Sequence, residues 1–127
     1  MNLSQLKEIL EAEVICGLEK LECVEIHTAF SADLMSDVLA FARSGCLLIT
    51  GLTTSQTVRT AFALDIAAIL VCRGKEPQAQ AVEIARELGI PLLRTEHIMF
   101  ETCGILYREG LRGCICDVQA GDKPCVE

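Results

Sequence analysis

The chain has 127 residues, the size of one domain, and 51% of them are hydrophobic, with four Phe, one Tyr and no Trp. This composition predicts a core built from aliphatic side chains. The formal net charge of −7 excludes a nucleic-acid-binding protein with a general basic surface, and it also excludes docking on anionic lipid.

The apolar runs are too short to predict a membrane span. The longest, residues 61–72, contains Asp65 and falls short of the roughly 20 residues that a span needs. The N-terminal sequence, MNLSQLKEILEAEV, lacks the basic start and apolar stretch of a signal peptide. We therefore expect a cytoplasmic protein whose eight cysteines are free thiols, a number that hints at an anaerobe.

The first 30 residues predict one helix and two strands. Apolar residues recur at helical spacing over 3–10, with Asn2 or Ser4 as the capping residue. Residues 13–16 read as a short strand, and a polar connection leads to an alternating strand at 24–30. The connection is too short for a crossover helix, so one of these strands is expected to pair antiparallel.

A second helix is expected to follow, with Ser31 as its cap. Asp33 and Asp37 would flank its first turns, where negative charge is favourable. The side chains predicted to face the core are Leu34, Val38 and Phe41, with Met35, Leu39 and Ala42 widening the stripe.

Residues 45–77 predict a strand–helix–strand crossover at the centre of the fold. An apolar strand at 46–50 ends at Gly51, and the three hydroxyl residues after it are placed to cap a helix. The second strand, 66–72, is apolar throughout, which is typical of a strand covered on both faces. The helix between them has an apolar stripe of Val58, Ala61, Phe62 and Leu64.

The last third predicts two helices and another strand. The first helix begins near Pro77 and ends at Gly89, and residues 90–93 form the strand. Thr95 is expected to cap the final helix. Its inward positions are Met99, Cys103 and Leu106.

These elements predict an α/β protein, a three-layer α/β/α sandwich around a mostly parallel sheet of about five strands. We assign residues 1–112 to a single domain and 113–127 to a cysteine-containing C-terminal tail.

The turn TGLTTSQT, residues 50–57, is the candidate anion site. No Gly-rich dinucleotide motif or P-loop occurs. The turn nevertheless joins the carboxyl end of a strand to a helix, where backbone N–H groups favour negative charge. The predicted binding residues are Gly51, Thr53, Thr54, Ser55, Arg73 and Gly74, and the predicted partner is a small anionic or nucleotide ligand. The alternative is that the hydroxyls only cap the helix and that Arg73 to Lys75 is an ordinary surface turn.

Cysteines near the C-terminus form a second candidate site. Cys103, Cys114, Cys116 and Cys125 could supply thiolates to zinc or to an iron–sulfur cluster, or act in redox chemistry. No CxxC pair is present, so the alternative is that they form no site. Cys46 and Cys72 lie in predicted buried strands and are expected to act as small hydrophobes.

An enzyme that acts on small phosphorylated metabolites at the TGLTTSQT turn is the last-ranked alternative, because the sequence positions no general base there. The two histidines, His27 and His97, lie on separate elements without ligands at metal spacing, and no nucleophile and base can be paired. No cofactor is therefore expected.

Several segments resemble the DRTGG-domain family in their order and spacing. They are ADLMSDV at 32–38, LITG at 48–51, Arg73-Gly74 followed by Pro77, and IPLLRT at 90–95. The resemblance spans roughly residues 3–110. Such domains are similar to the N-terminal domain of HPr kinase/phosphorylase, and they also occur in phosphate acetyltransferases and beside CBS domains.

The resemblance implies a non-catalytic regulatory or ligand-sensing domain that forms a homodimer. Stand-alone members occur near iron-only hydrogenase genes, which implies a link to anaerobic hydrogenase metabolism. The alternative function is a metal or redox accessory protein that uses the four C-terminal cysteines.

Overall fold

The computed structural model describes residues 1–114, which form a mixed α/β fold. The helices are α1 (Leu3–Leu10), α2 (Met35–Phe41), α3 (Ser55–Ala63), α4 (Ala79–Leu88), α5 (Met99–Arg108) and the 3-10 turn η1 (Leu18–Lys20). The strands are β1 (Glu13–Cys16), β2 (Thr28–Ser31), β3 (Leu47–Thr50), β4 (Ala68–Val71), β5 (Leu92–Arg94) and β6 (Arg112–Gly113).

The strands form one sheet in the order β1-β5-β4-β3-β2-β6. Strands β2, β3, β4 and β5 are parallel to one another, and β6 is parallel to β2. Among the strands of residues 1–114, only β1 runs antiparallel, against β5. The predicted α/β class, the mostly parallel sheet and the antiparallel member of the first strand pair are therefore confirmed. The sixth strand is a two-residue segment that the sequence does not reveal.

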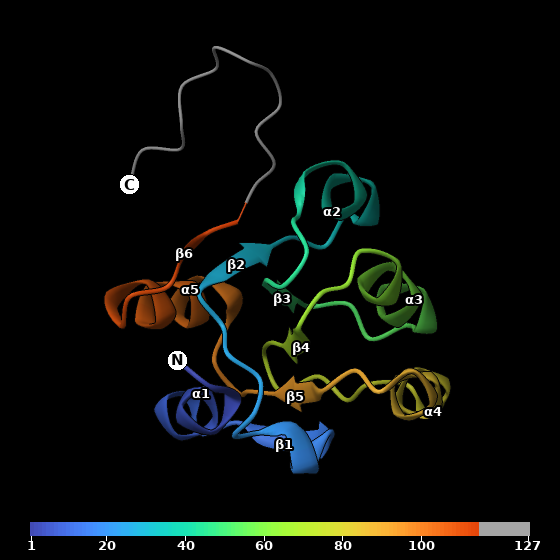
Figure 1. Cartoon of the computed structure of the whole chain (residues 1–127), viewed down its shortest axis with the longest axis horizontal. Coiled ribbons are helices and arrows are strands. Elements are labelled where there is room, and N and C mark those ends of the chain that lie inside the picture. Colours follow the sequence, from blue (N-terminus) through green and yellow to red (C-terminus); the bar gives the residue numbers. More distant parts are fainter. Residues whose placement is uncertain (115–127) are drawn as a thin grey trace.

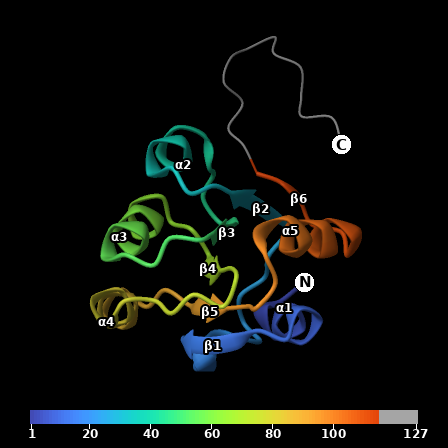
Figure 2. The same ribbon diagram turned by 180° about the vertical axis from the view of Figure 1, so that it is seen from behind.

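Helices cover both faces of the sheet, as predicted. Helices α2, α3 and α4 lie on one face, and α1 and α5 lie on the other (Figure 1), an arrangement that the reverse view also shows (Figure 2). Successive strand residues point to opposite faces, so each strand contributes to both cores. Leu48, Ile69 and Leu92 form a row against the first set of helices, whereas the row of Ile49, Leu70 and Leu93 packs against the second.

The strand predicted at 24–30 begins four residues later. Residues 24–26 instead bond to the N-terminal segment: the backbone N–H of Leu3 donates to Val24 O and that of Ile26 donates to Met1 O. These contacts hold α1 against the sheet. The same contacts account for the alternation of apolar and polar residues at 24–30, because Ile26 is completely buried although it lies outside the sheet.

The predicted helix ends are confirmed at Asn2 and at Gly89, the C-cap of α4, whereas the predicted caps Ser31 and Thr95 are wrong. Asn2 caps α1 through a capping box with Gln5, as expected. Ser31, however, ends β2, and Thr95 lies four residues before α5, where its hydroxyl donates to Leu10 O at 3.0 Å. Thr54 is at the N-cap position of α3 but makes no side-chain capping bond.

Two predicted inward stripes are also partly wrong. On α2, Met35 and Val38 are buried, whereas Leu34, Leu39 and Phe41 are exposed. On α3, Val58 and Ala61 are buried, but 54% of Phe62 is exposed. Within residues 1–114, no helix has the length and apolar character needed to cross a bilayer.

Candidate functional site

Four loops converge at one edge of the sheet because β2, β3, β4 and β5 are parallel and end on the same side. After β4 the chain passes to α4 on one face, and after β5 it passes to α5 on the other. Loops that diverge in this way leave a crevice at the carboxyl edge, the usual ligand position in open α/β sheets. A hollow of about 370 Å³ lies here, lined by Asp33, Gly51, Cys72, Arg73, Lys75, Ile98, Met99 and Phe100.

Asp33 joins two of the converging loops. Its Oδ1 accepts hydrogen bonds from the backbone N–H of Gly51 at 2.7 Å and from Thr50 Oγ1 at 2.9 Å. The sequence placed Asp33 at the start of a helix, but α2 begins two residues later at Met35. The carboxylate therefore organises the β3–α3 turn and adds one negative charge to the hollow.

The β4–α4 turn brings two cations to the hollow. Arg73 and Gly74 both have φ of +64°, which turns the chain sharply after β4. Their backbone N–H groups donate to His97 O and Thr95 O, each at 2.7 Å, so this turn is fixed to the β5–α5 loop. The ammonium group of Lys75 then reaches back to Gly51 O at 3.1 Å. The backbone of this turn is thus fixed to the β5–α5 loop, and the Lys75 ammonium to the β3–α3 turn.

Arg73 is the cation best placed to meet a ligand. A third cation at this edge, Arg94, is already bound to the carboxylates of Glu13 and Glu76, which raise its pKa. Arg73 is exposed and forms no ion pair with any residue between 1 and 114. Its charge is therefore available at the hollow, whereas that of Arg94 serves the sheet edge.

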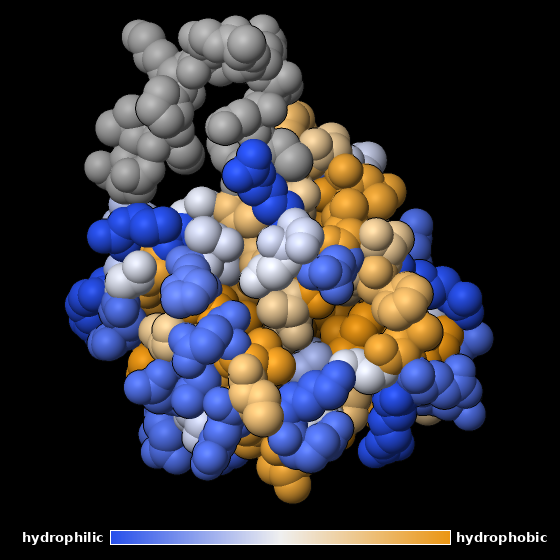
Figure 3. Space-filling view, viewed as in Figure 1, coloured by the Kyte–Doolittle hydropathy of each residue, from blue (hydrophilic) through white to orange (hydrophobic). Residues whose placement is uncertain are grey.

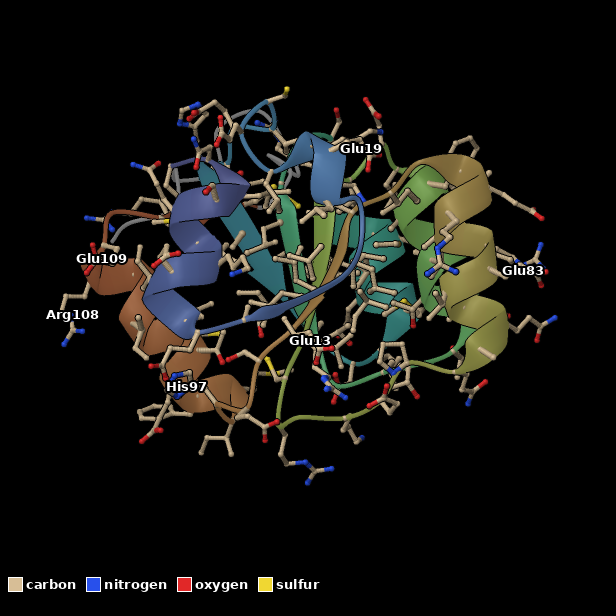
Figure 4. All side chains as sticks on the ribbon, turned by 90° about the horizontal axis from the view of Figure 1, so that it is seen from below. Glu13, Glu19, Glu83, His97, Arg108 and Glu109 are labelled. Atoms are coloured by element: carbon tan, nitrogen blue, oxygen red, sulfur yellow. The ribbon has the colours of Figure 1, made fainter. Side chains whose placement is uncertain are left out.

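Another part of the lining of the hollow is apolar. It consists of Ile98, Met99 and Phe100, where α5 begins. Phe100 is 81% exposed, the largest fraction among the big hydrophobic residues of the described chain. Figure 4 shows His97 at this beginning of α5, and Arg108 and Glu109 at its other end. The histidine contributes its backbone carbonyl to the Arg73 turn.

The structure separates the predicted anion-binding residues. Gly51 and Arg73 line the hollow, and Gly74 lies directly behind Arg73, packed against Glu96. Thr53 and Thr54 instead line a small space of about 10 Å³, together with buried Thr57. The Thr57 hydroxyl has no hydrogen-bond partner within residues 1–114. This space suits about one water molecule rather than a ligand.

Ser55 is the first residue of α3 and lines neither of these two spaces. Sequence reasoning missed Asp33 and the apolar wall as parts of the hollow. For Asp33 a signal existed, since it follows a strand that is parallel to β3 and adjacent to it. For Phe100 there was none, because its place depends on where α5 leaves the sheet.

The cysteine residues predicted as metal ligands are not gathered in the described part of the chain. Cys103 packs with the core under α1 and α5, and Cys114 with the core under α2 to α4, so the sheet lies between them. Cys116 and Cys125 lie outside the described residues. Between residues 1 and 114, no three His, Cys, Asp or Glu side chains are grouped for a metal ion.

Cys114 instead contacts the turn before β3. Its Sγ accepts a hydrogen bond from the backbone N–H of Arg43 at 3.2 Å. Cys46, which follows this turn, is completely buried. Burial, and next the neighbouring Cys114 thiol, raise the pKa of Cys46 to about 12. Cys46 is therefore a neutral thiol at physiological pH, as expected for a small core residue.

The comparisons with known proteins agree with this fold. The profile of the DRTGG domain family matches residues 5–108, most of the chain. The chain belongs to the DRTGG domain family. No protein with a curated description matches it.

A solved structure similar to this DRTGG domain contains the CBS and DRTGG domains of the regulatory region of Clostridium perfringens pyrophosphatase, complexed with the activator diadenosine tetraphosphate. The TM-score is 0.70 at 19% sequence identity, and the match covers 83% of the present chain. The chain spans 45% of that neighbour. The likeness therefore establishes a shared fold with part of a regulatory region.

Proposed function

We propose that this DRTGG domain is a non-catalytic regulatory module that senses a small anionic or nucleotide ligand in the hollow at the carboxyl edge of the sheet. The observation that carries the proposal is the placement of Arg73 and Lys75 on one wall of a space of about 370 Å³. This volume is within the range of small-molecule sites. Of the residues predicted from sequence, Gly51 and Arg73 line this space and Gly74 follows Arg73 in the turn, whereas Thr53, Thr54 and Ser55 do not line it.

A ligand bound in this hollow would contact loops that are hydrogen-bonded to one another. The Arg73 turn is bonded to the β5–α5 loop, and Lys75 is bonded to the β3–α3 turn. An anion held by these two cations would therefore tighten the connections among β3, β4 and β5. A decrease in the conformational freedom of these loops is a means by which a sensing domain can signal without catalysing a reaction.

Binding of inorganic tripolyphosphate to the purified chain tests this function. We expect saturable binding in isothermal titration calorimetry and a higher melting temperature with ligand present. Arg73→Ala and Lys75→Ala should each weaken binding by about tenfold or more, since each removes a charged hydrogen-bond donor.

Arg59→Ala is the matched control, because Arg59 is an exposed residue on α3 that does not line the hollow. Its affinity should equal that of the wild type. Absence of saturable binding, or equal binding by all three variants, would contradict a site at Arg73 and Lys75.

We also propose that the domain is a homodimer that pairs through α2 and α3. Four large apolar side chains are exposed on and beside these neighbouring helices: Leu34, Leu39, Phe41 and Phe62. Figure 3 shows apolar surface gathered over this part of the molecule. Exposed patches of this kind commonly mark protein interfaces, and pairing two copies would cover them.

Sedimentation equilibrium at micromolar concentration should give a dimer mass for the wild type. Leu39→Glu should give a monomer, because it places a charge in the interface. Leu18→Glu, an equally drastic change of an exposed leucine on η1, should remain dimeric. A monomeric wild type would exclude the dimer.

The assignment of residues 1–112 to the domain and of 113–127 to a cysteine-containing tail stays a proposal. Of that tail, Gly113 pairs with β2 and Cys114 packs in the core. The cytoplasmic location and the link to anaerobic hydrogenase metabolism stay predictions.

A further inference from the structure

The wall of the hollow is divided by chemistry. Arg73 and Lys75, from the β4–α4 turn, form a cationic side, whereas Ile98, Met99 and Phe100, from the start of α5, form an apolar side. A compact inorganic anion would contact only the cationic side. It would leave the apolar side in water, where it contributes nothing to affinity.

Phe100 is the most informative member of the apolar side. With 81% of its surface exposed, and Ile98 of the same lining 49% exposed, Phe100 offers apolar surface whose burial by a ligand would add to affinity. It lies on α5, beside the hollow, and not among the exposed residues of α2 and α3. The second-copy interface proposed above therefore does not account for its exposure.

The geometry points to a nucleoside phosphate as the ligand, with its base against Phe100 and its phosphates at Arg73 and Lys75. This inference rests on the proposed function and specifies the ligand class. A planar base can stack on an aromatic ring whatever its hydrogen-bonding edges are. Charged phosphates would meet the guanidinium and ammonium groups, which are the usual phosphate partners in proteins.

The test compares ATP with tripolyphosphate, which carries the phosphate chain without the nucleoside. We expect ATP to bind the wild-type chain about 5- to 150-fold more tightly, the range that stacking of one base supplies. Phe100→Ala should reduce ATP affinity toward that of tripolyphosphate and leave tripolyphosphate binding unchanged. Phe100→Trp should keep the preference for ATP, because it keeps an aromatic face.

Tyr107→Ala is the matched control, since Tyr107 is also an exposed aromatic residue of α5 but does not line the hollow. It should bind both probes as the wild type does. Equal affinity for ATP and tripolyphosphate, or a preference for ATP that survives Phe100→Ala, would overturn the base-stacking inference and leave the anion site intact. Failure of both probes to bind would overturn the inference together with the proposed function.

Discussion

At the scale of single residues, Asp33 sets the character of the hollow. Its Oδ1 accepts hydrogen bonds from the Gly51 N–H and the Thr50 hydroxyl. These two donors are therefore already bonded and do not face an incoming anion. The turn after β3 is consequently not an anion cradle in itself. Anion binding has to depend on the two side-chain cations instead.

Asp33→Asn is expected to raise the affinity for tripolyphosphate about 3- to 10-fold. The amide oxygen can still accept the two hydrogen bonds, but the negative charge near the ligand is removed. Titration calorimetry at low salt measures the change. Asp37→Asn makes the same change of charge within α2 and should leave affinity nearly unaltered. Weaker binding by Asp33→Asn would show that the carboxylate helps to hold the ligand.

Gly74→Ala should lower the free energy of unfolding by about 1 kcal/mol, because a left-handed backbone is costly for a residue with a side chain. The φ of Gly74 is +64°, and an added Cβ would lie 2.5 Å from Oε1 of Glu96. Glu96 is exposed and can move, so the backbone conformation supplies most of the cost. Urea unfolding gives the value.

Gly104→Ala is the contrasting control. Gly104 lies inside α5 with open space around it. Alanine is the better helix former, so this variant should be more stable by up to about 1 kcal/mol. The Gly74 prediction is wrong if both variants are stabilised.

At the scale of elements, hydrophobic periodicity predicted the central crossover well. The continuous apolar runs at β3 and β4 are typical of strands covered on both faces. Between them, Val58 and Ala61 have the three-residue spacing that places two side chains on one face of a helix, and both are buried. Caps were harder to predict, because a hydroxyl near a helix start has other partners. Thr95 illustrates this: its hydroxyl bonds Leu10 O, from a segment 85 residues away in sequence.

Gln78→Asp should stabilise the protein by about 0.5–1 kcal/mol, since a short acidic side chain can accept from the free N–H groups of the first turn. Gln78 is the exposed N-cap residue of α4, and its side chain makes no capping bond. Thermal and urea unfolding both measure this gain. Gln80→Asp adds the same charge to the first turn without the cap position and should gain much less. Equal gains would mean that charge, and not capping, is responsible.

At the scale of the whole molecule, the sequence could not predict which face each helix covers. An amphipathic pattern shows that a helix has a buried side, but it is the same for either face of a sheet. Helix α5 crosses to the face of α1 and leads to β6, at the far edge from β1. Phe100 and Ile98 reach the hollow for this reason. The cationic side could be predicted because Arg73 directly follows a central strand.

The buried cysteines make the stability of the whole domain sensitive to alkaline pH. Burial raises the pKa of Cys16, Cys46 and Cys72 above the ordinary value of 9.0, to about 12 for Cys46. As the pH rises, thiols in the unfolded chain lose their protons before those in the folded chain. The contribution of these thiols to the free energy of unfolding is therefore fully present below about pH 9. The free energy of unfolding should then fall by up to about 1.4 kcal/mol per pH unit for each thiol as the pH rises above 9, and for Cys46 this loss continues toward pH 12.

Urea unfolding from pH 8 to 11, in the presence of a reductant, follows this loss. Cys46→Ala should be less stable at neutral pH, because a buried side chain is truncated, but its stability should decline less steeply with pH. An unchanged slope in the variant would show that Cys46 does not carry the predicted dependence.

The central claim is that the carboxyl-edge hollow binds a small anion. Amide chemical shifts in two-dimensional NMR, recorded during titration with tripolyphosphate, test it most directly. We predict saturable shifts at Gly51, Arg73, Lys75 and Phe100, with a common dissociation constant that Arg73→Ala weakens. Shifts confined to another part of the surface, such as the turn around Lys20 and Gly89, or no shifts at all, would contradict it.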